Sequence, residues 1–398
     1  MEHKTRIKGN VHYVGVNDRN KHRFEAMWPL PYGVSYNSYL IDDEMVALVD
    51  TVDICYFEVY LRKIKQVIGE RPINYLIINH MEPDHSGSIR LIKQHYPEII
   101  IVGNKQTFGM IEGFYGVTGE QYLVKEGDFL ALGHHKLRFY MTPMVHWPET
   151  MMTFDETDGV LFSGDGFGCF GTVDGGFLDT RINVDKYWGE MVRYYSNIVG
   201  KYGSPVQKAL QKLGGLPISA ICSTHGPVLT ENIAKVIGIY DRLSRYDADE
   251  GVVIAYGSMY GNTEQMAEAI AEELSAQGVK NIVMHNVTKS HPSYIIADIF
   301  RYKGLIIGSP TYSNQIFPEV EALLSKILLR EVKGRYLGYF GSFAWAGAAV
   351  KRMAEFAEKS KFEIIADPVE MKQAMKDLTY TQCENLARAM ADRLKKDR

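Results

Sequence analysis

Two hydrophobic patterns divide the chain. Up to about residue 248, short apolar runs bounded by polar turns predict strands with interspersed helices. The expected strands are 36–41, 45–50, 73–79, 98–104, 135–143, 159–165 and 218–224, and residues 57–69 have helical spacing. The pattern changes after the polar stretch 245–251, so we expect two domains, 1–248 and 249–398.

The second region alternates strands with amphipathic helices. An apolar strand at 252–257 is followed by a helical pattern at 263–278. Further strands are expected at 281–287, 304–310, 335–343 and 362–368. Five strands that alternate with helices over about 150 residues predict a doubly wound parallel sheet, so the fold class is α/β.

Composition and charge exclude several classes of protein. A formal net charge of −4 and a pI of about 6.3 argue against a nucleic-acid binder. No run approaches the roughly 20 apolar residues of a membrane helix, and the charged N-terminus lacks the apolar core of a signal peptide. The four cysteines are scattered and form no C-x-x-C pair, which indicates reduced thiols in the cytoplasm rather than a cysteine-bound metal.

Four side chains that commonly bind metals lie close together in NHMEPDHSG (79–87): His80, Glu82, Asp84 and His85. Burying such a group without a cation would be costly, so the stretch predicts a metal site. In an extended loop the first three would point to one side, because they are two residues apart. Pro83 and the following Ser-Gly-Ser could supply the bend that His85 needs.

Three further candidates follow expected strands: His146, Asp165 and His225. Strand ends that meet at one edge are where α/β folds build sites. Each candidate also has an ordinary interpretation, since a single histidine after a strand is more often structural and Asp165 between two glycines could be a turn acid. The cluster at 80–85 favours the metal interpretation for all three. The remaining histidines, including the pair at 134–135 in a turn, lack this placement.

The first region resembles a metallo-β-lactamase-fold domain, whose motif H-x-H-x-D-H is followed by a histidine, an aspartate and a final histidine. Here the string reads H-x-E-x-D-H, which is similar to one branch, the flavodiiron proteins, and the resemblance extends over the whole chain. It implies an N-terminal αββα sandwich with two irons. The iron nearer the flavin would be held by His80, Glu82 and His146. The other would be held by Asp84, His85 and His225, with Asp165 as the bridge.

The carboxylate of Glu82 itself favours redox chemistry over hydrolysis. Carboxylates suit iron and stabilise its ferric state electrostatically. Added negative charge near zinc would instead make a zinc-bound water less acidic and therefore a poorer nucleophile.

Three loops at strand ends predict a flavin site. The loop GSMYGNTEQ (257–265) has small and hydroxylic residues whose backbone N–H groups can surround a phosphate, although alone it could be a plain turn with Thr263 as N-cap. Loops 309–318 and 341–347 follow the third and fourth strands, where a flavodoxin-like sheet binds FMN. Tyr312 and Trp345 offer aromatic faces for the ring, although either could serve packing.

The resemblance to flavodoxin implies contacts to FMN from all three loops. The implied phosphate contacts are Ser258, Met259, Tyr260, Gly261, Asn262 and Thr263. The implied ribityl and ring contacts are Pro310, Thr311, Tyr312, Asn314, Ser342, Phe343, Ala344, Trp345 and Gly347.

A flavin beside a diiron site suits the reduction of O2 to water or of NO to N2O, which would remove these gases from the cell. The family resemblance implies a head-to-tail homodimer, or a dimer of such dimers, and rubredoxin or a rubredoxin-reductase-type electron donor. Trp147, Tyr194 and Tyr195 are candidate wall residues of the gas site, although each could serve packing. The alternatives are a binuclear zinc hydrolase fused to an FMN electron-carrier module, and a non-catalytic electron carrier whose metal braces the fold.

Overall fold

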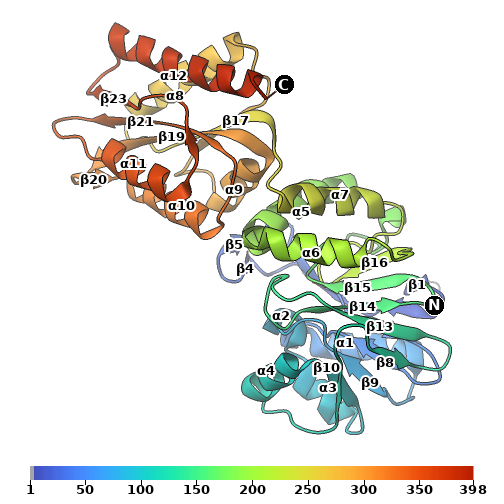
Figure 1. Ribbon diagram of the computed structural model, residues 1–398. Coiled ribbons are helices and arrows are strands. Elements are labelled where there is room, and N and C mark those ends of the chain that lie inside the picture. The colour runs from blue at the N-terminus through green and yellow to red at the C-terminus, as the bar shows by residue number, and fades with distance from the viewer. Residues whose placement is uncertain (1–3, 398) are drawn as a thin grey trace. The chain divides into compact units, whose positions relative to one another are not determined.

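A computed structural model describes residues 4–397 (Figure 1). Residues 1–3 and 398, at the ends of the two predicted domains, lie outside the described residues. The chain divides into two compact units, one up to Tyr195 together with Tyr202–Asp241, the other Ser196–Lys201 together with the chain from Arg242 onwards. The boundary predicted between residues 248 and 249 remains a proposal. Within residues 4–397, no helix is both long and apolar enough to cross a membrane.

Two sheets form the frame of the first unit. One has seven strands in the order β1-β2-β7-β8-β9-β10-β11, and the other has five in the order β12-β13-β14-β15-β16. Val49 and Ile77 of the first sheet share one buried core with Phe139 and Phe162 of the second. The predicted sandwich is therefore present, with the core between its sheets.

The strands of this unit are short. The seven-stranded sheet comprises β1 (Arg6–Lys8), β2 (Val11–Tyr13), β7 (Tyr39–Ile41), β8 (Ala47–Val49), β9 (Tyr75–Ile77), β10 (Ile100–Gly103) and β11 (Gln121–Leu123). The five-stranded sheet comprises β12 (Phe129–Ala131), β13 (Lys136–Met141), β14 (Met151–Asp155), β15 (Val160–Gly164) and β16 (Ala220–Ser223). Two separate ribbons pair β3 (Val16–Asp18) with β6 (Val34–Tyr36), and β4 (Arg23–Phe24) with β5 (Trp28–Pro29).

Within residues 4–397, six α-helices lie between these strands and a seventh follows β16: α1 (Phe57–Ile68), α2 (Pro83–Ser86), α3 (Ile89–His95), α4 (Lys105–Tyr115), α5 (Asp185–Tyr194), α6 (Gly203–Leu213) and α7 (Ile233–Ser244). Helix α1 forms where the apolar spacing predicted it, and its buried residues are Phe57, Tyr60, Leu61, Ile64 and Ile68. It ends at Gly69, whose φ of 62° is a conformation that glycine adopts without steric cost.

Strand direction determines which loops meet. Strands β8, β9 and β10 are mutually parallel. In the other sheet β14 is antiparallel to both β13 and β15, and β15 is parallel to β16. The carboxyl ends of β13, β15 and β16 therefore share an edge with the beginning of β14.

The second unit contains the predicted parallel sheet, and its strands lie in the order β18-β17-β19-β21-β22, with β20 paired to β19 and β23 paired to β21. Its strands are β17 (Asp249–Tyr256), β18 (Ile282–Asn286), β19 (Tyr302–Tyr312), β20 (Gln315–Ile316), β21 (Tyr336–Phe343), β22 (Glu363–Ile364) and β23 (Val369–Lys372). Its helices are α8 (Asn262–Ala276), α9 (Pro292–Arg301), α10 (Pro318–Leu329), α11 (Ala349–Ser360) and α12 (Asp377–Lys395). Helices α8 and α12 pack against each other, and both contribute to the buried core.

The fifth strand differs from its prediction. The run 362–368 pairs with β21 only at Glu363–Ile364, and pairing resumes at Val369–Lys372. Pro368 lies in the gap, and proline has no N–H group to donate to a neighbouring strand. In the first unit the sequence analysis did not predict β1 to β5, β11, β12 and β14, and its strand 36–41 includes only the last residue of β6. Most of these have only two or three residues, too few to show an alternation.

Candidate metal centre and flavin pocket

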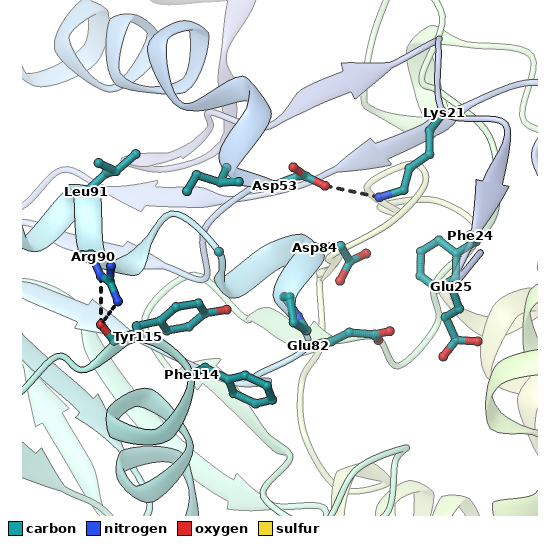
Figure 2. Close-up of a pocket in the computed structure, with 13 residues that line it drawn as sticks. Lys21, Phe24, Glu25, Asp53, Glu82, Asp84, Arg90, Leu91, Phe114 and Tyr115 are labelled. Atoms are coloured by element: carbon teal, nitrogen blue, oxygen red, sulfur yellow. Dashed lines mark hydrogen bonds and ion pairs between the residues drawn. The ribbon is translucent and has the colours of Figure 1, made fainter.

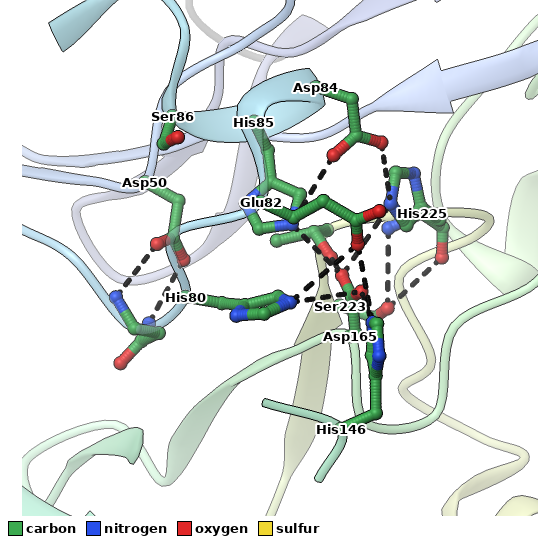
Figure 3. A network of polar contacts seen from close by, with 12 residues as sticks. Asp50, His80, Glu82, Asp84, His85, Ser86, His146, Asp165, Ser223 and His225 are labelled. Carbon is green, nitrogen blue, oxygen red and sulfur yellow. Dashed lines mark hydrogen bonds and ion pairs between the residues drawn. The ribbon is translucent and has the colours of Figure 1, made fainter. Parts of the chain in front are cut away.

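The seven predicted metal ligands come together at one edge of the first unit (Figure 3). Their positions in the chain are His80 after β9, Glu82 directly before α2, Asp84 and His85 within α2, His146 after β13, Asp165 after β15 and His225 after β16. Asp84 is partly buried and the other six are buried. The folded chain therefore brings all seven predicted residues together.

The local structure of the motif differs from the prediction. The chain does not stay extended through Asp84, because a short helix begins at Pro83 and carries both Asp84 and His85. Proline favours the first position of a helix, where its fixed φ is suitable and its missing N–H group is not needed. Pro83 thus starts the turn that carries His85, and Ser86 and Gly87 complete it, with the N–H of Gly87 donating to the carbonyl oxygen of Pro83 at 2.9 Å.

Asp165 occupies the middle of the group. Its Oδ2 lies 3.1 Å from His146 Nε2 and 3.6 Å from His80 Nε2. Its Oδ1 lies 3.2 Å from His85 Nε2 and 3.5 Å from His225 Nε2. The four histidines therefore form two pairs, one beside each oxygen of a single carboxylate.

The other two carboxylates extend the two pairs to two groups of three. Glu82 Oε2 lies 3.2 Å from His146 Nε2 and 3.7 Å from His80 Nε2. Asp84 lies beside the second pair, with Oδ2 at 3.3 Å from His225 Nε2 and Oδ1 at 3.6 Å from His85 Nε2. The two groups have the same members as the two ligand sets that the sequence resemblance implied, and His85 also lies close to the first group.

Several ligand atoms of this group are buried without a hydrogen-bond partner: His80 Nε2, His85 Nδ1 and Nε2, His225 Nε2 and both carboxylate oxygens of Asp84. Buried polar atoms are almost always satisfied in folded proteins, so an unsatisfied cluster calls for a missing partner. Cations between the two groups of side chains would satisfy all of them except His85 Nδ1. The residues present therefore fit a binuclear metal centre.

The electrostatics of the group also require positive charge. Burial raises the pKa of Glu82, but hydrogen bonds with His146 and His80 lower it to about 2. Burial lowers the pKa of His85, but the neighbouring Asp165 and Asp84 raise it to about 10. In the absence of a cation, the carboxylates would therefore have to be balanced by protonated histidines. A set of four imidazoles and three carboxylates suits iron better than the histidine-rich sets that bind zinc.

Sequence analysis missed the residues that orient these side chains. His80 Nδ1 lies 2.7 Å from Glu149 Oε1, and His225 Nδ1 lies 2.8 Å from the carbonyl oxygen of Ser35. Because these oxygens can only accept, each Nδ1 donates and each Nε2 lone pair is left for the centre. Thr224 Oγ1 donates to Asp165 Oδ1. Glu149 occurs three residues after His146, and this short spacing is the local signal that could have located it.

Aromatic rings surround the centre. Trp147 contacts His80 edge-to-face, with ring centroids 5.2 Å apart, and Tyr194 lies 5.8 Å from the ring of His225. The Tyr194 hydroxyl is buried without a hydrogen-bond partner. Tyr195 packs on Tyr240 instead, at 4.9 Å. Two of the three predicted wall residues, Trp147 and Tyr194, thus lie against histidines of the centre.

A cavity of about 640 Å³ leads to this centre (Figure 2). Glu82 and Asp84, one from each group of side chains, line it together with Phe24, Phe114 and Tyr115. The centre is therefore reachable from a largely apolar space within the first unit.

The predicted flavin loops surround a separate cavity of about 450 Å³ in the second unit. Eleven of the fifteen predicted residues line it: Met259, Tyr260, Asn262, Pro310, Thr311, Tyr312, Asn314, Ser342, Phe343, Ala344 and Trp345. Ser258, Gly261, Thr263 and Gly347 do not, while Ser313, Ala346 and Gln373 line it without having been predicted. Gln373 comes directly after β23 (Val369–Lys372), a segment that lies beyond the predicted fifth strand at 362–368.

Contacts within the flavin loops explain some of these differences. Ser258 Oγ accepts the N–H of Gly261, whose φ is 88°, and so shapes the turn before α8. Thr263 is not an N-cap, since it lies within the helix and its hydroxyl pairs with Ser342 at 2.8 Å. Thr311 Oγ1 accepts the N–H groups of Ala348 and Ala349, so its side chain caps α11 while the residue lines the cavity.

One further group of acidic and imidazole side chains lies elsewhere in the first unit. His135 Nδ1 is 2.9 Å from Asp155 Oδ2 and 4.0 Å from Asp158 Oδ2. The histidine is thus already paired with a carboxylate, in agreement with its interpretation from sequence as a structural residue.

Fold and site together define a class of protein in which a binuclear-metal domain of the lactamase fold precedes a flavodoxin-like domain. The family model of the ODP family β-lactamases matches residues 34–226, and the flavodoxin model matches residues 254–386. The chain is 33% identical over 396 residues to the rubredoxin-oxygen oxidoreductase of Megalodesulfovibrio gigas, covering 98% of each chain. It is 32% identical to the anaerobic nitric oxide reductase flavorubredoxin of Vibrio vulnificus, over 90% of this chain and 73% of that one.

Solved structures agree with this classification. Rubredoxin oxygen:oxidoreductase from Desulfovibrio gigas superimposes with a TM-score of 0.93 at 31% identity, covering 97% of both chains. The flavodiiron protein from Giardia intestinalis gives a TM-score of 0.91 at 26% identity, covering 97% of this chain and 95% of that one. The chain belongs to the flavodiiron protein family, and the predicted family and fold class are confirmed.

Proposed function

We propose that the protein is an oxidoreductase that uses a diiron centre and FMN to reduce O2 to water, NO to N2O, or both. One iron would be held by His80, Glu82 and His146, and the other by Asp84, His85 and His225. Asp165 would bridge them. The observation that carries this assignment is that each oxygen of Asp165 lies beside a different pair of histidines whose ligand atoms are buried.

The second unit would hold FMN in the cavity formed by its three loops. The beginning of α8 offers backbone N–H groups to the phosphate, and the helix dipole favours an anion there. Trp345 is 80% exposed and Tyr312 is 49% exposed at the rim of the cavity, so both faces are available to an isoalloxazine ring.

Electron counting supports the two substrates. A diiron centre and FMN can each supply two electrons, which together match the four that O2 reduction to water consumes, while coupling of two NO molecules consumes two. The residues of this chain would exclude bulk water with Phe24 and Trp147 and would hold the centre's charge with three carboxylates. The names of the two relatives support both gases and a rubredoxin donor. They favour a reductase over a zinc hydrolase.

The decisive test is metal analysis and turnover of the purified protein. We expect about two irons and one FMN per chain and consumption of O2 or NO with reduced rubredoxin or a rubredoxin-reductase-type donor. Steady-state rates with each gas, on protein of known iron content, would establish the preference. Protein that takes up only zinc and hydrolyses ester or amide bonds would overturn the proposal.

We further propose a head-to-tail homodimer, or a dimer of such dimers, in which the FMN of one chain serves the irons of the other. The cavity beside Glu82 and Asp84 and the exposed aromatic rim of the flavin cavity are surfaces that such a contact would cover. The cytoplasmic location expected from the cysteines also remains a prediction.

Mixing two inactive variants tests the dimer. Asp165→Ala removes the proposed bridge, and Trp345→Asp with Tyr312→Asp disables the flavin rim. After subunit exchange, about half of the dimers contain one chain of each variant. If the FMN of one chain serves the irons of the other, each such mixed dimer has one working FMN–iron pair out of two, so the mixture regains about a quarter of the wild-type activity. If each chain works alone, the mixture stays inactive.

A further inference from the structure

Glu149 is a buried carboxylate at the metal centre that is not one of the seven proposed ligands. It has no exposed surface, and its Oε1 lies 2.7 Å from His80 Nδ1. It precedes β14, which is antiparallel to its neighbours β13 and β15. The beginning of β14 therefore lies at the edge where β13 and β15 end. The N–H group of Met151 donates to the carbonyl oxygen of Asn79 at 3.0 Å, which joins the start of β14 to the residue before His80.

One oxygen of Glu149 holds two parts of the ligand motif. The same Oε1 that accepts from His80 also accepts the N–H of Met81 at 2.9 Å. Met81 lies between the proposed ligands His80 and Glu82, so this contact fixes both the imidazole ring and the backbone that leads to the carboxylate. Asn104 Nδ2 donates to the carbonyl oxygen of Glu149 at 2.6 Å and holds Glu149 itself in place.

The two groups of three ligands are not supported equally. His80, in the first group, donates to a carboxylate, whereas His225, in the second, donates to the neutral backbone carbonyl of Ser35. A carboxylate acceptor makes the opposite nitrogen of an imidazole a stronger donor to a metal than a neutral carbonyl does. The chemical difference between the two metal positions is thus present in the protein before any metal binds.

We propose that Glu149 is a positioning residue that makes the two metal positions unequal, by strengthening the one held by His80, Glu82 and His146. The inference rests on the proposed metal site but not on its redox function. Removing such a partner lowers metal affinity by about 10–100-fold in comparable sites. The loss is therefore confined to one of the two metals.

The test measures metal release from the loaded protein into an excess of chelator. In Glu149→Ala, the affinity for one of the two irons is lowered by about 10–100-fold. The affinity for the other iron stays at the wild-type value. Glu149→Gln keeps an acceptor oxygen for His80 and Met81 but loses the charge, so its effect is smaller. The midpoint potential of the diiron centre rises in Glu149→Gln, because a negative charge beside it is removed.

Asp155→Asn is the matched control. Asp155 is the last residue of β14, is fully buried, and accepts from a histidine, His135, at 2.9 Å. This variant loses a carboxylate–histidine pair at the other end of the same strand, so it reports general destabilisation. It should release both irons as the wild type does.

With the iron-loaded protein, two outcomes would overturn the inference: equal weakening of both metals in Glu149→Gln, or release identical to that of the wild type in both Glu149 variants. Repeating the measurement with zinc-loaded protein separates this inference from the proposed function. Unequal release of zinc with no gas reduction would reject the reductase and leave the role of Glu149 intact. Unequal release only with iron would contradict a role based on hydrogen bonding to His80.

Discussion

The hydrogen bond between Thr224 and Asp165 offers a sharp test of how the central carboxylate is held. Thr224 Oγ1 donates to Asp165 Oδ1, and each residue is only 1% exposed. Thr224→Val replaces the hydroxyl with a methyl group of nearly the same size. The backbone of Thr224 stays anchored through its N–H group, which donates to the carbonyl oxygen of Gly164 at 2.9 Å. The substitution therefore removes one contact and little else.

The expected cost follows from the type of bond. A hydrogen bond to a charged group contributes about 1.5–3 kcal/mol, and the valine leaves a carboxylate oxygen unsatisfied in a buried place. In a unit of this size each kcal/mol corresponds to about 2–4 °C in Tm, so Thr224→Val should lower the melting temperature of the first unit by about 3–12 °C. Thr224→Ser keeps the hydroxyl and should stay within about 3 °C of the wild type, because it loses only one methyl group, worth about 0.8 kcal/mol.

The assay is thermal unfolding followed by circular dichroism, on metal-free protein and on protein with two metals per chain. A bound metal would itself neutralise part of the charge on Asp165. The difference in melting temperature between the valine and serine variants should therefore be larger in the metal-free protein. The reasoning is refuted if the two variants melt at the same temperature in the metal-free state.

Three other predictions test separate parts of the structure. Glu82→His should lower the preference for iron over zinc by at least about tenfold, measured by metal analysis after loading with both ions, because a carboxylate that stabilises ferric iron is lost; an unchanged ratio would contradict it. Burial lowers the pKa of His135, but the hydrogen bond with Asp155 raises it above 6.5. The stability that His135→Gln removes should therefore be fully present below pH 6.5 and be lost as pH rises through the folded-state pKa. Denaturant titrations from pH 6 to 9 measure the difference in unfolding free energy between the two proteins, and a difference independent of pH would count against the ion pair. Trp345→Leu should weaken FMN binding by about 2–12-fold, the equivalent of 0.5–1.5 kcal/mol of ring stacking, seen as a shift in the fluorescence titration of FMN; unchanged affinity would remove Trp345 from the flavin site.

Local patterns were enough to locate the candidate ligands and most of the flavin loops. His80, Glu82, Asp84 and His85 are close in sequence, and they stay close in any fold. His146 and Asp165 could be assigned to the same site because each follows a strand, and strands that run in the same direction end at the same edge of the sheet. The same rule could not find Glu149, because it stands before an antiparallel strand whose beginning, and not its end, lies at that edge.

The amino-acid sequence by itself determined the fold class, the order of the two halves and the chemical types that could bind metal, because hydrophobic period and side-chain chemistry are local properties. Only the tertiary structure decided how those groups are oriented. The placement of Asp165 between two pairs of histidines, the donation from His80 to Glu149 and the approach of Gln373 to the flavin cavity join segments far apart in the chain. Such contacts depend on strand direction and register, which are set when sheets pair and pack, and no short stretch of sequence contains them.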